Sequence, residues 1–234
     1  MFKCVRDYMF RVLSYFLVIV FAVLTACQLP AAVSGIKAGW QIYLPLLYGV
    51  GANFILSRIS LFSRNQDHLR TLSHELTHWL VGLMLFKKIH SLNVEEDTGS
   101  VVHSGGRFGQ MFLSLSPYCF PIFTIILLLL RFIIAKEYLF GFDIAVGMTL
   151  GFHIGCFMSQ IGSHQSDITK YGLFRSYVYI AALWMFFFLV ILFSVRYDLF
   201  YAVKDIFVGY WDTLNVFWDF CADLVDKIVK WLKN

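Results

Sequence analysis

Long apolar segments are the feature that most constrains how this chain folds. A helix needs about 20 predominantly apolar residues to cross a bilayer. Of the 234 residues, 59% are hydrophobic and only 15% are charged. This composition predicts an all-α polytopic membrane protein, for which we expect six transmembrane helices and a multi-pass location in a cell membrane. The segments are residues 12–33, 38–56, 69–86, 111–134, 144–161 and 177–195.

The amino terminus permits two interpretations. Basic residues precede an apolar run that ends in Leu24-Thr25-Ala26-Cys27, a pattern typical of a bacterial lipoprotein signal cleaved before a lipidated cysteine. Because five further apolar segments follow, we favour an uncleaved first transmembrane helix. The intact mass of the protein distinguishes the two, since cleavage would remove the first 26 residues.

The distribution of Lys and Arg favours a cytoplasmic amino terminus. With six crossings, nine basic residues lie on the amino-terminal side and six on the other, and the positive side is usually cytoplasmic. The nine are Lys3, Arg6, Arg11, Arg58, Arg64, Arg70, Arg131, Lys136 and Arg196, and the six are Lys37, Lys87, Lys88, Arg107, Lys170 and Arg175.

The third apolar segment contains an HExxH motif, HELTH at residues 74–78. On a helix, residues four apart share one face, so His74 and His78 can bind one zinc ion. Glu75 is then placed to accept a proton from a zinc-bound water. Ionisable side chains within apolar membrane segments usually mark a functional site. The motif therefore predicts a metal site with Glu75 as the catalytic base.

A polar stretch follows the motif. Residues 87–110 contain two loosely alternating segments around Glu95-Glu96-Asp97-Thr98-Gly99, which predicts a β-hairpin. Its exposed strand edge is a candidate for pairing with an unwound substrate, and an ordinary solvent loop is the alternative. In the next segment, Pro117 and Pro121 predict a kink that frees backbone carbonyls.

A catalytic zinc usually has three protein ligands and one open position, so a third ligand must come from elsewhere in the chain. The downstream candidates are Asp143, His153, His164 and Asp167. Asp167 lies beyond the fifth apolar segment, so residues 160–168 would have to turn back toward the histidines. His153 lies inside that segment, where a lone histidine is more often a hydrogen-bonding group than a ligand.

Five stretches together resemble the site-2-protease-like membrane zinc metallopeptidases of bacteria. They are HELTHWL at 74–80, GSVVHSGG at 99–106, SLSPYCFPIF at 114–123, GFHIG at 151–155 and QSDI at 165–168. The resemblance covers residues 69–175 and implies that His74, His78 and Asp167 bind Zn²⁺ while Glu75 acts as base. The LDG motif that presents the ligand Asp in well-known members is absent, and QSD stands in its place.

The resemblance implies an intramembrane zinc metalloprotease of the inner membrane that cleaves transmembrane segments of other membrane proteins, such as membrane-tethered regulators or remnant signal peptides. The alternatives are a non-catalytic zinc-site scaffold and an ion- or proton-conducting protein. We divide the chain into amino-terminal helices (1–68), a metallopeptidase core (69–175) and a carboxy-terminal part (176–234). The absence of a basic tract argues against nucleic-acid binding.

The carboxy-terminal residues 197–234 keep a seven-residue register. Asp recurs every seven residues from Asp198 to Asp226, and two apolar stripes run beside it, with Gly209 as a weak point. Such 3,4 spacing predicts an amphipathic helix that packs on another helix, in a homo-oligomer, a partner or this chain itself. A membrane-surface helix is the alternative, which the acidic stripe disfavours.

Overall fold

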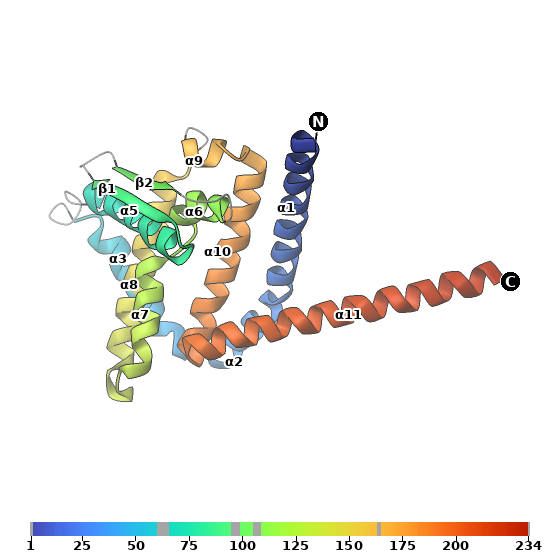
Figure 1. The fold of residues 1–234 in the computed structure, drawn as a ribbon. Coiled ribbons are helices and arrows are strands. Elements are labelled where there is room, and N and C mark those ends of the chain that lie inside the picture. The colour runs from blue at the N-terminus through green and yellow to red at the C-terminus, as the bar shows by residue number, and fades with distance from the viewer. Residues whose placement is uncertain (1, 60–65, 95–98, 105–108, 163–164, 234) are drawn as a thin grey trace.

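The structure, a computed structural model, describes residues 2–59, 66–94, 99–104, 109–162 and 165–233 and is mostly helical (Figure 1). The α-helices are α1 (Phe2–Cys27), α2 (Leu29–Gly39), α3 (Leu44–Leu56), α5 (Gln66–Met84), α6 (Gln110–Leu115), α7 (Ile122–Leu130), α8 (Leu139–Gln160), α9 (Ser166–Thr169), α10 (Leu173–Arg196) and α11 (Leu199–Lys233). Short 3₁₀ helices are η1 (Trp40–Tyr43), η2 (Ser116–Tyr118), η3 (Arg131–Ile133) and η4 (Lys136–Tyr138).

The number of candidate membrane spans is smaller than the six predicted. Within the described residues, three helical stretches are long and apolar enough to cross a membrane, or four if a bent pair counts as one span. The first two predicted segments merge into one continuous stretch, Val12–Leu56. The others are Lys136–Gln160, Leu173–Arg196 and the bent pair Gln110–Tyr118 with Ile122–Ile133.

The predicted span at residues 69–86 is not among these candidates. Its helix, α5, is 19 residues long and begins with polar residues, and Asp67, Arg70 and Glu75 all lie on it. Three charged residues in so short a helix make it a poor membrane span. Figure 1 shows α5 lying obliquely near one end of α8 and α10, at the level of α6 and α9.

Close helix packing joins α3 to α8. A Cβ atom at Gly49 would collide with the backbone oxygen of Ile144, and one at Gly147 would collide with that of Leu46. Small residues allow helix backbones to approach this closely, which is typical of membrane helix pairs. The main hydrophobic core extends from this pair to α10, through buried residues that include Leu46, Val146 and Leu189.

The predicted kink between Pro117 and Pro121 is confirmed. Helix α6 and η2 end before Pro121, and α7 continues at 88° to them. Proline cannot donate a backbone hydrogen bond, so Pro121 interrupts the helix between η2 and α7. The bend brings α6 beside α5 instead of leaving it in line with α7.

The predicted hairpin is also present. Strands β1 (Lys88–Val94) and β2 (Gly99–Ser104) pair antiparallel, with a bulge between Ile89 and Ser91. The predicted turn residues 95–98 lie outside the described residues. The hairpin packs on α5, where Gly82 leaves room for the Ile89 side chain.

Candidate metal centre

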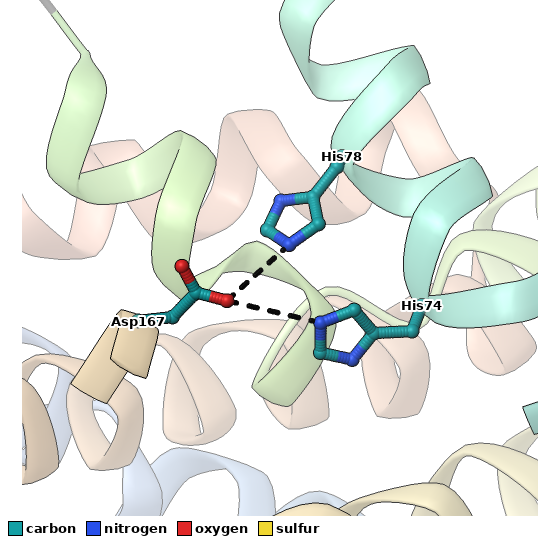
Figure 2. A group of neighbouring side chains, drawn as sticks. All are labelled: His74, His78 and Asp167. Atoms are coloured by element: carbon teal, nitrogen blue, oxygen red, sulfur yellow. Dashed lines mark ion pairs between the residues drawn. The ribbon is translucent and has the colours of Figure 1, made fainter. Parts of the chain in front are cut away.

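Two histidines of α5 and one aspartate of α9 converge on a common point (Figure 2). The Nε2 atoms of His74 and His78 lie 3.9 and 3.6 Å from Oδ2 of Asp167. The possible ligand atoms of these three residues all lie within 4.8 Å of one another. Of the candidate third ligands, the structure therefore brings Asp167 to the HExxH histidines.

The donor set is one that could hold a metal ion. Two imidazole nitrogens and one carboxylate oxygen form one of the usual three-ligand sets, which leaves a fourth tetrahedral position open. Tetrahedral bonds of about 2.0–2.1 Å separate neighbouring ligand atoms by about 3.3 Å. The observed distances of 3.6 and 3.9 Å are slightly longer than that separation. The group can hold a metal ion with a small inward movement of the side chains.

Asp167 reaches the histidines without a deep re-entrant turn. Helix α8 ends at Gln160, and the one-turn helix α9 begins at Ser166. The backbone oxygen of Ile168, whose side chain is fully buried, accepts a hydrogen bond from Ser176 of α10 at 2.8 Å. Because α5 lies near the end of α8, the short segment between α8 and α9 is enough to bring Asp167 to the histidines. The sequence had suggested that this segment must turn further back into the membrane.

The kink of the fourth apolar segment positions His78. The backbone oxygen of Leu113 would normally accept the N–H of the residue four positions later, but that residue is Pro117, which has no N–H. The free carbonyl accepts a hydrogen bond from His78 Nδ1 at 2.8 Å and one from Ser116 Oγ at 2.9 Å. A proton held on Nδ1 leaves Nε2 free as a metal ligand.

Gln160 orients the ring of His74 in the same way. Its Oε1 atom lies 3.4 Å from His74 Nδ1, and its Nε2 donates to the backbone oxygen of Arg70 at 3.4 Å. The last residue of α8 therefore orients the side chain of a candidate ligand on α5. The ring of Tyr118 packs edge-on against that of His74, with ring centroids 5.3 Å apart.

We expect Gln160→Leu to weaken zinc binding by about 10–100-fold, the usual effect of removing a partner that orients a metal-binding histidine. Leucine is similar in size but cannot accept the proton of His74 Nδ1. Competition with a fluorescent zinc chelator measures the affinity. Gln160→Glu keeps an acceptor oxygen and should bind zinc nearly as well as the wild type. Equal affinities for all three proteins would contradict an orienting role.

Glu75 points into the same cavity but is not part of the ligand group. Its side chain is buried, and it lines a cavity of about 240 Å³ together with the three candidate ligands. Burial raises the pKa of Glu75, and the nearby His74 and His78 partly offset this increase. A raised pKa suits a carboxylate that must both accept and release a proton.

Asp167 has the opposite electrostatic environment. Burial alone would raise its pKa, but hydrogen bonds and charge interactions with His74 and His78 outweigh burial and hold the pKa well below its usual range. The carboxyl group is therefore ionised at neutral pH. Two carboxyl groups in one cavity thus differ in character, one suited to binding a cation and one to transferring a proton.

The remaining candidate ligands lie elsewhere. His153 is buried in α8, stacks on Trp184 with ring centroids 5.0 Å apart, and its Nε2 has no hydrogen-bond partner in the part of the chain that the structure describes. Asp143 forms an ion pair with Arg131 at 2.8 Å. His164 lies outside the described residues.

Two cavity residues were not singled out from the sequence. His103 of β2 and Lys170, just after α9, line the cavity beside Glu75. Along β2, Val101 and His103 are half-buried and line the cavity, whereas Val102 is exposed. This alternation was the available signal, because residues two apart on a strand share a face.

Comparisons with protein-family models, with curated proteins and with solved structures found no match to this chain.

Proposed function

We propose that this chain is an intramembrane zinc metalloprotease. One observation carries the proposal: Nε2 of His74, Nε2 of His78 and the carboxylate of Asp167 converge in a cavity that Glu75 also lines. Three helical stretches in the described part of the chain are also long and apolar enough to span a membrane, which supports a membrane protein. Peptide hydrolysis is the reaction that best fits this combination of a three-ligand site and an adjacent carboxylate.

The groups in the cavity would have separate roles in peptide hydrolysis. Bound zinc would polarise the scissile carbonyl and lower the pKa of a coordinated water to about 7. Glu75 would accept the proton of the attacking water and pass it to the leaving amine. His103 and Lys170 line the same cavity and would donate hydrogen bonds to the carbonyl oxygen as negative charge develops there.

The position of the site indicates where a substrate would be cut. Asp167 and α9 immediately precede α10, so the site lies at the amino-terminal end of that span. Substrates would be transmembrane segments of other membrane proteins, cleaved near one end of the helix, where the backbone unwinds most easily. Strand β2 borders the cavity through Val101 and His103 and could pair with such an unwound segment.

The distribution of charge supports a cytoplasmic site in a bacterial inner membrane. Because α5 is not a candidate span, basic residues that the sequence placed on opposite sides lie at the same end of the spans as the metal centre. Among the described residues that flank the spans, the site end has Lys3, Arg6, Arg11, Arg58, Arg70, Lys87, Lys88, Lys170 and Arg175. The other end has Lys37, Arg131, Lys136, Arg196 and Lys204. The more positive side is usually cytoplasmic.

The first test is the metal content of the purified protein, measured by elemental mass spectrometry. We expect about one zinc per chain, as one ligand group of this kind implies, and loss of most of it in Asp167→Ala. His153→Phe is the matched control: it keeps the stacking on Trp184 and should retain zinc. Zinc loss in the His153 variant with retention in the Asp167 variant would contradict the ligand assignment.

Cleavage must then depend on the metal. The wild type, reconstituted in phospholipid nanodiscs, should cleave fluorescein-labelled casein or a single-span reporter protein, lose this activity to a zinc chelator and regain it with added zinc. Stoichiometric zinc without cleavage of either probe would favour a scaffold. Absence of zinc together with ion flux in vesicles would favour an ion-conducting protein.

A further inference from the structure

The last helix leaves the body of the protein partway along its length. Helix α11 has 35 residues, and in its first part Ala202 and Ile206 are fully buried and Tyr210 nearly so. From Leu214 to Trp231 every side chain is exposed except that of Cys221, which is half-buried. Figure 1 shows this free half (residues 214–233) extending past α1, with no other element beside it.

The first part of α11 is fixed across the ends of two other helices. Tyr210 shares a buried hydrogen bond with Thr25 near the end of α1, 2.7 Å between oxygens, and Gln28 donates to Thr213 at 3.3 Å. Gly209 leaves room for the Gln28 side chain, so this glycine serves a contact and is not merely a weak point. Because α11 follows α10 directly, it lies at the level where that candidate span ends.

The apolar face of the packed part continues into the free half. At 100° per residue, the positions of Ile206 and Tyr210 are followed on the same face by Phe217, Leu224 and Ile228. In the packed part, this face contacts α1 and α10, which extend from α11 toward one side (Figure 1). The free half therefore turns its apolar face toward the same side, where the acyl chains around α1 and α10 would be.

The breadth of that apolar face distinguishes lipid from a partner helix. A coiled-coil seam is a narrow stripe of two positions in seven. In the free half, apolar residues occupy more than half of the helix circumference, and a membrane-surface helix has such a broad face. These residues are Leu214, Phe217, Trp218, Phe220, Cys221, Ala222, Leu224, Val225, Ile228, Val229 and Trp231, whereas Val216 lies on the opposite face.

The opposite face is polar apart from Val216, and its charges largely balance one another. Asp223 pairs with Lys227 at 2.6 Å, and Asp226 pairs with Lys230 at 2.5 Å. The acidic stripe seen in the sequence is thus balanced in the last turns, and Lys233 follows. Such a surface needs no strongly anionic membrane, and neutral phospholipid headgroups are compatible with it.

We propose that residues 214–233 of α11 lie in the headgroup region of the bilayer, with the apolar face against the acyl chains. This contact is on the side opposite the metal centre, because α9 precedes α10 and α11 follows it, and α10 has 24 residues. At 1.5 Å per residue the two ends are about 36 Å apart. The inference does not rest on the proposed protease function.

Site-directed spin labelling of the full chain in phosphatidylcholine nanodiscs tests this placement. A nitroxide on Cys221 reports the apolar face, after the other cysteines are replaced by alanine. A nitroxide on Asp219→Cys, with Cys221→Ala, reports the polar face. We expect the Cys221 label to collide with oxygen, which concentrates in lipid, several-fold more than with a water-soluble nickel complex. The label at position 219 should show the reverse preference.

Three other results would each overturn the proposal. Free access of the nickel complex to both labels would place the helix in water. Shielding of Cys221 from both reagents, with dipolar coupling between chains, would identify a second copy as the occupant. The double variant Phe217→Asp with Leu224→Asp should lower the oxygen preference at Cys221 several-fold, and an unchanged preference would also count against lipid contact.

Discussion

Replacing Glu75 by Gln is expected to leave the zinc content unchanged and to lower the cleavage rate by about 10²–10⁴-fold, the usual contribution of a general base. Glutamine has the same shape as glutamate but cannot accept the proton of the attacking water. Zinc binding should persist because Glu75 lines the cavity without belonging to the converging ligand group. The expected loss is therefore in the rate of chemistry and not in folding.

The measurement compares initial rates on the same labelled casein and single-span reporter, at equal zinc content verified by elemental mass spectrometry. Glu137→Gln provides the matched control, because Glu137 is an exposed carboxylate in η4 and the chemical change is identical. That control should keep the wild-type rate. A Glu75→Gln variant that cleaves at the wild-type rate would exclude Glu75 as the base.

The local part of the site was predictable from the sequence. Two histidines four residues apart on one helix face need only helix geometry, and the structure has both on α5. Asp167 was different, because the residues alone left four candidates open. Its selection came from the resemblance, since the approach of α9 to α5 depends on packing that no short sequence pattern records.

The contacts that orient the histidines could not be read from residue types. One is a backbone carbonyl, that of Leu113, which becomes available because Pro117 follows four residues later. The sequence indicated that such carbonyls would be free but not which side chain would use them. Gln160 is likewise an ordinary polar residue until the end of α8 meets α5.

The six predicted spans were not confirmed, for a physical reason. Counting apolar residues measures length, and it does not show that a segment bends or that a helix lies near a membrane face. Pro117 and Pro121 divide one predicted span, and the charged residues of α5 remove another from the candidates. The close α3–α8 contact through Gly49 and Gly147 also depends on which helices become neighbours. The three-part division of the chain stays a prediction.

Arg131→Met is expected to destabilise the protein by about 3–5 kcal/mol, the usual cost of removing one partner of a buried ion pair. Arg131 binds Asp143 through two parallel hydrogen bonds of 2.8 and 3.1 Å. It also donates to the backbone oxygens of Ser194 and Val195 at the end of α10. Without the guanidinium, a carboxylate inside a candidate span would lack its counter-charge, and the last carbonyls of α10 would lose their donor.

The double variant Arg131→Met with Asp143→Leu separates these two effects. Removing both charges abolishes the uncompensated carboxylate, so we expect it to recover most of the loss, as hydrophobic replacement of buried pairs often does. Arg131→Lys keeps the charge but not the planar fork and should fall between the wild type and Arg131→Met. Unfolding in mixed micelles with increasing SDS, followed by circular dichroism, measures all four proteins. A single variant as stable as the wild type would show that this pair does not hold α8 and α10 together.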